Sequence, residues 1–391
     1  MNFPEFKTTV LLSFAFRPLF LLLVIQALVH IPVWYLMWQG YLAVDWPVNP
    51  ALWHGHEMLN GFAGAAIGGF LLTAVATWTG RKAVSGWPLI LLCLFWIVAR
   101  GSLIVPQLAA TASIAYWLGL LLLMAREVLL AGNQRNYKVV LILLLFLLLE
   151  LAFQYAFLSR ADWLREIVWI QLWLIVLLIN LIGGRIIPAF TRNWLKRHRP
   201  SLTDKQLPRP FGKVDLVASL TLPGFAILSL IQVSEPLLVA SALIAAFFQI
   251  WRLLRWQGFR TFADPLVWMM HLAYAWIPLG ILLFAGGLKG MLPVSMGIHA
   301  LGIGTVASMI VSVASRAALG HTNRPLIAHP LLTLSIVLIS LAALLRILAS
   351  SSSSSMLLSA ATVIWSVAFA AFAIRYLPIL LFPAKGNSGQ H

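Results

Sequence analysis

Nine histidines are the residues of this chain best suited to chemistry, and most of them lie in or beside strongly apolar segments. An imidazole nitrogen is a common ligand of haem iron and copper, and it exchanges protons near neutral pH. Ionisable side chains within membrane-spanning segments are costly, so they usually face the interior of a helix bundle and mark functional sites. His198 and His391 stand in polar segments and are set aside.

The pair His54 and His56 opens a long apolar segment with glycines at positions 61, 64, 68 and 69. On a helix, residues two apart point roughly 200° apart, so the pair cannot bind one metal ion unless that turn is unwound. In a regular helix the pair would serve two sites on opposite faces. The glycines would let another helix or a flat cofactor approach closely. The alternative is an interfacial cap, with both histidines hydrogen-bonded at the water boundary.

His271 and Tyr274 lie three residues apart within another apolar segment and therefore share a helix face. The tyrosine hydroxyl is thus placed beside whatever the histidine binds. The alternative interpretation is a hydrogen bond between two helices, worth about 1 kcal/mol.

His299 opens a further apolar segment and adjoins Gly302 and Gly304. We expect it at the same outer depth as His54 and His56. Histidines at one depth on different helices are how imidazole-ligated metal or haem sites are built in helix bundles. His30, also expected at that depth, is more typical of a packed histidine on an apolar face.

Three charged residues within or at the ends of apolar segments have more than one interpretation. Arg185, just before the expected helix end at Pro188, is suited to pairing with an anionic group such as a haem propionate or to snorkelling to the interface. Snorkelling is favoured for Arg17. Glu150 has no partner visible in the sequence.

Cys93 is the only cysteine and no Cys-x-x-Cys-His motif occurs, so any haem would be held non-covalently.

The elements that must position these residues are membrane-spanning helices. The 391 residues are 61% hydrophobic and only 10% charged, against roughly 25% charged in soluble domains. The apolar residues come in runs of about 20, the length that crosses ~30 Å of hydrocarbon. The sequence therefore predicts an all-α integral membrane protein, a bundle of about 12 transmembrane helices in one polytopic domain over residues 1–391. The predicted spans are 15–38, 54–78, 87–105, 109–130, 138–158, 166–188, 214–234, 236–254, 265–285, 294–315, 327–349 and 356–380.

The net charge of +16 does not indicate a nucleic-acid partner, because the basic residues stand in short segments between apolar runs. This placement instead predicts the orientation of the chain in the bilayer. With both termini and the central loop 189–213 in the cytoplasm, most of the 27 lysines and arginines fall on that side. The exceptions are four in outer segments (Arg160, Arg165, Lys289, Arg346) and two within spans (Arg100, Arg185).

Five ordered segments resemble the NnrS family of bacterial membrane proteins. They are FAFRPLF (14–20), WHGHEM (53–58), GGRIIPAFTRN (183–193), HLAYAW (271–276), and HA (299–300) continuing through RAALGHTNRPL (316–326). The resemblance covers most of the chain, and five motifs in order are far more specific than any one. Gly55, Ala273 and Asn323 depart from the family pattern, but none of them removes a candidate ligand.

The resemblance implies a haem- and copper-containing protein of the bacterial inner membrane, linked to nitric oxide and nitrosative stress and common in denitrifying or pathogenic bacteria. We therefore expect a non-covalent b-type haem, copper, and nitric oxide as the bound gas. The expected ligands are His54, His56, His271 and His299. Tyr274 and Arg185 are expected beside the cofactor, and His321 is a lower-ranked metal ligand because it belongs to a matched motif.

Two further functions compete with this expectation. A membrane transporter of a metal or small anion would use the histidines as transient ligands, but no internal repeat typical of transporters is evident. A nitric-oxide-reducing enzyme would need electron entry and proton delivery. The sequence shows no electron-carrier domain, so an electron donor would be an unidentified partner, and enzyme status is left open.

Overall fold

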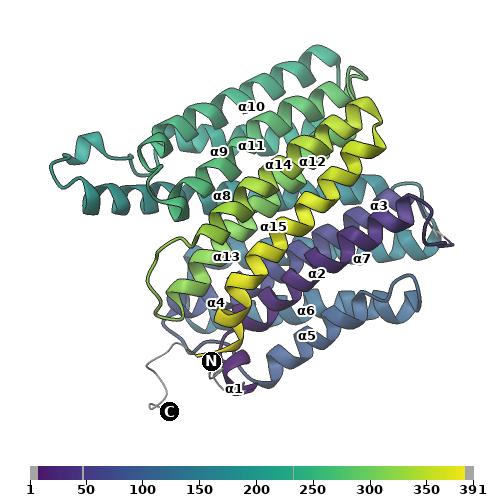
Figure 1. Cartoon of the computed structure of the whole chain (residues 1–391), viewed down its shortest axis with the longest axis horizontal. Helices are drawn as coiled ribbons and strands as arrows, with labels where there is room; N and C mark the ends of the chain where they lie inside the picture. The colour runs from purple at the N-terminus through teal and green to yellow at the C-terminus, as the bar shows by residue number, and fades with distance from the viewer. Residues whose placement is uncertain (1–7, 46–47, 232, 384–391) are drawn as a thin grey trace. The chain divides into compact units, whose positions relative to one another are not determined.

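The computed structural model describes residues 8–45, 48–231 and 233–383, and all regular elements in these ranges are helices (Figure 1). Eleven helical segments of this part of the chain are long and apolar enough to cross a membrane. The prediction of an all-α membrane protein is therefore confirmed. The prediction of a single polytopic domain stays a prediction, because the chain divides into two compact units that are described separately below.

Unit 1 comprises the chain up to Gln171, together with Ala314–Pro325 and the segment from Ala373 onward. Within it α4 packs between α2 and α6, and α6 also contacts α5 and α7. Its helices are α1 (Thr8–Leu11), α2 (Phe16–Trp38), α3 (Pro50–His56), η1 (Glu57–Phe62), α4 (Ala63–Thr79), α5 (Trp87–Ala99), α6 (Pro106–Leu130), η2 (Gln134–Asn136), α7 (Tyr137–Ser159) and the start of α8 (Leu164–His198).

Unit 2 comprises Leu172–Val313 and Leu326–Phe372. Its helices α9, α10 and α11 are successive neighbours, and α12 packs against both α11 and α14. Besides the rest of α8, unit 2 contains η3 (Asp204–Gln206), α9 (Lys213–Leu230), α10 (Glu235–Arg255), η4 (Gly258–Arg260), α11 (Pro265–Leu288), α12 (Val294–His299), η5 (Ala300–Ala307), the beginning of α13 (Ser308–Gly320), α14 (Pro330–Ser352) and most of α15 (Ser355–Leu381).

The predicted span 87–105 is a shorter helix than expected. Helix α5 has 13 residues and ends at Ala99, which makes it about 20 Å long at 1.5 Å per residue. A turn follows, in which Arg100 reaches Glu57 at the start of η1. Helix α5 and the turn after it therefore still cross unit 1, from the end where α4 finishes to the end where η1 begins. Helix α6 then crosses the unit in the opposite direction.

The predicted helix end at Pro188 is wrong, because α8 continues to His198 with Pro188 inside it. A proline removes one backbone donor, but membrane helices tolerate this where neighbouring groups satisfy the freed carbonyl. The loop predicted over 189–213 is thus reduced to the residues between α8 and α9, and these include the short helix η3.

Two of the membrane helices contain a π-helical segment, and each segment directly follows a histidine of interest. Segment η1 follows His56 and continues into α4, and η5 follows His299 and continues into α13. π-Helical turns within α-helices occur frequently at functional sites. They draw attention to these two positions, one in each unit.

Arg17 does not snorkel as predicted: its side chain is buried at the start of α2. Its Nη1 donates to the carbonyl oxygens of Ile379 at 3.1 Å and Leu380 at 2.8 Å. The beginning of α2 and the end of α15 therefore lie at one end of unit 1. The assignment of this end to the cytoplasm stays a prediction.

Candidate functional site

His271 lies near the beginning of α11 and is 7% exposed. Its Nε2 is 2.8 Å from the hydroxyl oxygen of Thr191 on α8. That hydroxyl has one hydrogen, and it donates this hydrogen to the carbonyl of Ile187 at 2.9 Å. The histidine must therefore be the donor to Thr191, with its hydrogen on Nε2.

The other ring nitrogen of His271, Nδ1, then carries a lone pair, and it is buried without a hydrogen-bond partner among the described residues. Gly258 at the start of η4 lies against this nitrogen, and a Cβ at position 258 would collide with the imidazole ring. Buried polar atoms are rarely left unsatisfied. The lone pair on Nδ1 is therefore chemically available to ligate a metal.

Tyr274, one turn further along α11, is fully buried. Its hydroxyl oxygen is 2.7 Å from Asn180 Oδ1 and 2.5 Å from Gln249 Oε1, and it accepts a hydrogen bond of 3.0 Å from Arg252 Nη1. Among the described residues His271 is not one of its hydrogen-bond partners. The sequence predicted that the Tyr274 hydroxyl lies beside the group that His271 binds. In the structure this hydroxyl instead belongs to a separate polar cluster.

Arg252 is the centre of that cluster and is 1% exposed. It forms a 3.0 Å ion pair with Asp215 of α9 and donates to Asn180 of α8 at 2.7 Å. The guanidinium lies directly against Gly184, where a side chain would collide with it. The neighbouring Arg185, the predicted anion partner, is exposed.

His299 ends α12 in the same unit. Its Nδ1 donates to the carbonyl of Ser295 at 2.7 Å, which leaves the lone pair on Nε2. A backbone carbonyl that fixes one nitrogen while the other is presented to a metal is the usual arrangement of a ligating histidine. Trp276, Ala343 and Ile347 form an apolar cluster against Ala300, the next residue.

The two histidines of unit 2 cannot hold the same metal ion. Helices α11 and α12–η5 run antiparallel, as close approaches of Gly287 to Val294 and of Gly280 to Leu301 show. On this pairing His299 lies level with residue 282, which is 11 residues along α11 from His271. The separation along the axis is about 16 Å at 1.5 Å per residue.

In unit 1 the histidines already have partners. His54 Nδ1 is 3.1 Å from His30 Nε2, so the two imidazoles share a hydrogen bond. The Trp34 ring stacks on His54 with a centroid distance of 4.6 Å. His30, interpreted from the sequence as a packed residue, is indeed buried. The two residues lie at one depth, as expected.

His56 is turned away from His54 and lies between two carboxylates. Its Nε2 is 3.0 Å and 3.1 Å from the two Glu150 oxygens, and its Nδ1 is 3.6 Å from Glu57 Oε1. Phe153 stacks on the ring at 3.8 Å. Glu150, which had no visible partner in the sequence, is held by His56 and by Gln154 at 2.6 Å.

Glu57 also forms a 2.5 Å ion pair with Arg100 and accepts from Gln26 at 3.4 Å. The carboxylate is 2% exposed and the guanidinium 15%. The two carboxylates, Arg100 and His56 therefore form one polar network inside unit 1. Glu57 Oε1 has no hydrogen bond among the described residues, but each side chain of the network has at least one partner. The network is therefore suited to holding α3, α5 and α7 together.

His321 lies just after α13 in unit 1, outside the membrane helices. Its ring is about 6 Å, centroid to centroid, from the rings of Phe14 and Phe16. Partial burial lowers the pKa of His321, so the imidazole is neutral at neutral pH. The structure therefore brings His321 together with aromatic rings rather than with other histidines.

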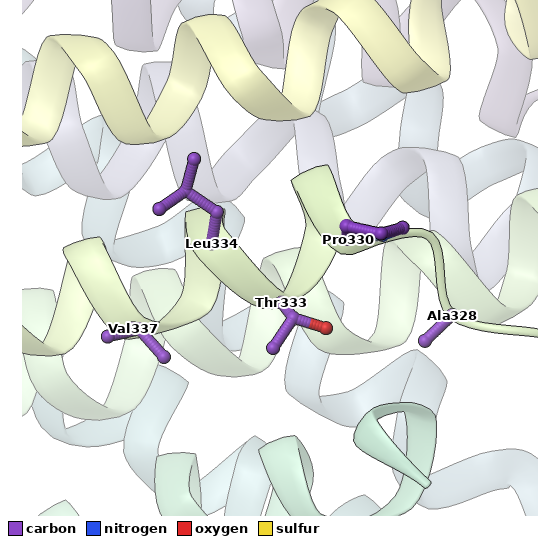
Figure 2. A pocket seen from close by; sticks show the side chains of 5 residues that line it. All are labelled: Ala328, Pro330, Thr333, Leu334 and Val337. Atoms are coloured by element: carbon purple, nitrogen blue, oxygen red, sulfur yellow. The ribbon is translucent and has the colours of Figure 1, made fainter.

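Within the described part of the chain, no three His, Cys, Asp or Glu side chains group together as a metal site. A pocket of about 420 Å³ on unit 2 is lined by Ala328, Pro330, Thr333, Leu334 and Val337 (Figure 2). None of these side chains is ionisable or binds metals, so the pocket is not part of the candidate site. A group held by a single histidine fits the residues better. Haem, which needs only axial ligands from the protein, is such a group.

Several site residues were missed by sequence reasoning. Arg252 stands near the end of a span, where a basic residue is expected to face solvent, and Thr191 falls in the predicted loop. The adjacent glycines Gly183 and Gly184 were the available signal, because a glycine in a membrane helix permits close approach of a neighbour. No signal pointed to Gly258.

The chain matches the family described as NnrS protein over residues 10–383, which is nearly its whole length. No curated protein and no solved structure matches it. The matched range includes both units and all four histidines expected as ligands. The chain therefore belongs to the NnrS protein family.

Proposed function

We propose that this protein binds a b-type haem, and copper, inside a bacterial inner membrane, that it binds nitric oxide, and that it protects the cell against nitrosative stress. Membership of the NnrS family fits a role in nitrosative stress. The observation that carries the haem assignment is the buried, unpartnered Nδ1 of His271 beside Gly258.

In this proposal His271 and His299 each hold a separate group, since about 16 Å of helix lies between them. A ferrous haem with an open axial position supplies the chemistry that binds nitric oxide. Thr191 fixes the His271 ring by accepting its Nε2 hydrogen. Trp256, whose ring lies 6.3 Å from that of His271, excludes water from this part of the unit.

His54 and His56 stay predicted ligands and rank below His271 and His299, because both ring nitrogens of His56 face carboxylates and His54 is bonded to a second imidazole rather than to a fixed oxygen. Copper is less well supported than haem. A copper ion bound by protein side chains alone needs several ligands together, and such a group is absent among the described residues.

The absorption spectrum of the detergent-purified protein tests the proposal, recorded oxidised, reduced, and reduced with nitric oxide, with iron and copper analysis on the same sample. We expect a Soret band that shifts with nitric oxide and is lost in His271→Ala. The control is His198→Ala, because His198 is exposed at the end of α8 and should leave the spectrum unchanged. A colourless, metal-free protein after expression with added haem would exclude the proposal.

A transporter of a metal or small anion is the second candidate. The observation that favours it is the pair of buried charged clusters, Glu57–Arg100 in unit 1 and Asp215–Arg252 in unit 2, because such residues often mark ion pathways in membranes. The same spectrum separates the two functions, since a transporter has no chromophore.

A further inference from the structure

A cluster of three arginines at one end of unit 1 has more positive charge than the described residues around it balance. Arg17 begins α2, Arg324 follows α13, and Arg375 lies near the end of α15. Arg17 and Arg324 both donate to backbone carbonyls at the end of α15, and Arg375 lies on the same helix four residues before Ile379, whose carbonyl Arg17 contacts. The like charges of these side chains therefore repel one another. Burial, and after it the charge of Arg375, lowers the pKa of Arg324.

The described part of the chain supplies little compensation for these charges. Among the described residues, none of the three arginines forms an ion pair with a carboxylate; Glu127, the acidic residue at the neighbouring end of α6, is paired with Arg81. Arg17 and Arg324 do cap the end of α15, through carbonyls that include Leu380 and Pro383. A helix C-terminus supplies roughly half a negative charge, which is far less than three guanidinium charges require.

Two guanidinium nitrogens in this cluster are also buried without a hydrogen-bond partner among the described residues. They are Nε of Arg17, whose side chain is 5% exposed, and Nη1 of Arg324. Each guanidinium presents its donors in a planar fork that matches the oxygens of phosphate or carboxylate. An anion with several oxygens would accept from these buried donors and offset the neighbouring like charges.

We propose that Arg17, Arg324 and Arg375 form a binding site for a phosphate-group anion at this end of unit 1. The site lies where apolar helices begin and end, which is the depth of lipid headgroups in a bilayer. The phosphate therefore comes either from an anionic phospholipid or from free phosphate. Since partial burial keeps His321 neutral, it adds no charge to the site.

Thermal unfolding of the delipidated, detergent-purified protein tests the site without any reference to haem. We expect inorganic phosphate or phosphatidylglycerol to raise the midpoint by on the order of 5 °C at saturation. Chloride at equal ionic strength is the control for inorganic phosphate, because it screens charge in the same way. Phosphatidylcholine is the control for phosphatidylglycerol, because it is a lipid without net charge. A rise with phosphatidylglycerol alone identifies a lipid headgroup, and a rise with inorganic phosphate identifies a free anion.

Arg375→Gln is the informative variant, because Arg375 has no hydrogen bond to a helix-end carbonyl among the described residues and its loss removes no cap. We expect at least about tenfold weaker anion binding. Without the anion, its midpoint should lie above that of the wild type, because one of three repelling charges is gone. Arg135→Gln, an exposed arginine at the same end of unit 1, should behave as wild type.

Two outcomes overturn the proposal. One is a wild-type midpoint that neither phosphate source raises above its control. The other is an Arg375→Gln protein that responds to the anion as strongly as Arg135→Gln does. The first outcome needs no variant, so the test stands even if a variant fails to fold.

Discussion

The histidines of the two units differ in what holds their ring nitrogens. In unit 1, His54 is bonded to another histidine and His56 to a carboxylate. In unit 2, His271 and His299 each donate to a neutral oxygen, and the second nitrogen keeps its lone pair. The partner on the neighbouring turn or helix therefore decides whether an intramembrane histidine is available to a metal. On this comparison unit 1 uses its histidines to build a polar core, and unit 2 leaves on each of its two histidines the lone pair that the proposed ligand role requires.

The largest expected effect comes from breaking the polar core of unit 1. Glu57→Gln leaves Arg100 without its counter-charge among buried groups. Removing one partner of a buried ion pair costs about 3–5 kcal/mol, and denaturant unfolding in detergent measures this loss. The double variant Glu57→Gln/Arg100→Gln should be less destabilised, because no uncompensated charge remains. Haem bound per folded protein should stay at the wild-type level; a fall would show that unit 1 also carries a ligand.

A smaller effect is expected from the hydroxyl that orients His271. Thr191→Val removes the acceptor for Nε2 while keeping the shape of the side chain. Loss of such a supporting hydrogen bond weakens metal binding by about 10–100-fold, which a haem titration of the apoprotein measures. Thr191→Ser keeps the hydroxyl and should restore binding. A purely structural role for Thr191 would change the unfolding midpoint but leave the iron–histidine vibration unaltered.

The close packing of Gly258 against the His271 ring gives the next prediction. Gly258→Ala places a methyl group where the imidazole ring lies, and we expect a loss of about 1–3 kcal/mol from overpacking, with a displaced Soret band. The matched control is Gly212→Ala in the same unit, where the nearest atoms are 3.8 Å from the added carbon. Equal spectra for the two variants would mean that Gly258 is not part of the haem site.

The sequence was sufficient for the all-α membrane fold, because apolar runs of about 20 residues have few interpretations. The choice of His54, His56, His271 and His299 as ligands stays a prediction. The sequence failed at Pro188, where a helix-breaking residue is tolerated inside α8. Tertiary packing overrides the local preference of proline in a membrane helix.

The sequence could not assign partners to the polar residues. Glu150 and His56 stand 94 residues apart, and Asn180 and Arg252 stand 72 apart. Nothing in local spacing shows that these pairs meet, since each contact depends on which helices are neighbours. The hydroxyl of Tyr274 was predicted on the correct face of α11, but its partners come from α8 and α10. The difference between the two units is therefore a property of the tertiary structure.

The smallest expected effect tests unit 1 at the residue that was first expected to be a ligand. His54→Phe keeps a ring against Trp34 and removes the hydrogen bond to His30. Hydrogen bonds between membrane helices are worth about 1 kcal/mol, so unfolding should change by roughly that amount and His30→Phe should match it. Bound haem and copper should be unchanged in both, because in the proposal His271 and His299 rank first as the residues that hold the bound groups. If His54→Phe loses as much metal as His271→Ala while His30→Phe loses none, His54 is a ligand after all. The hydrogen bond to His30 would then orient the His54 ring as Thr191 orients His271. In both units, a hydrogen bond on one ring nitrogen would position the other nitrogen for a metal.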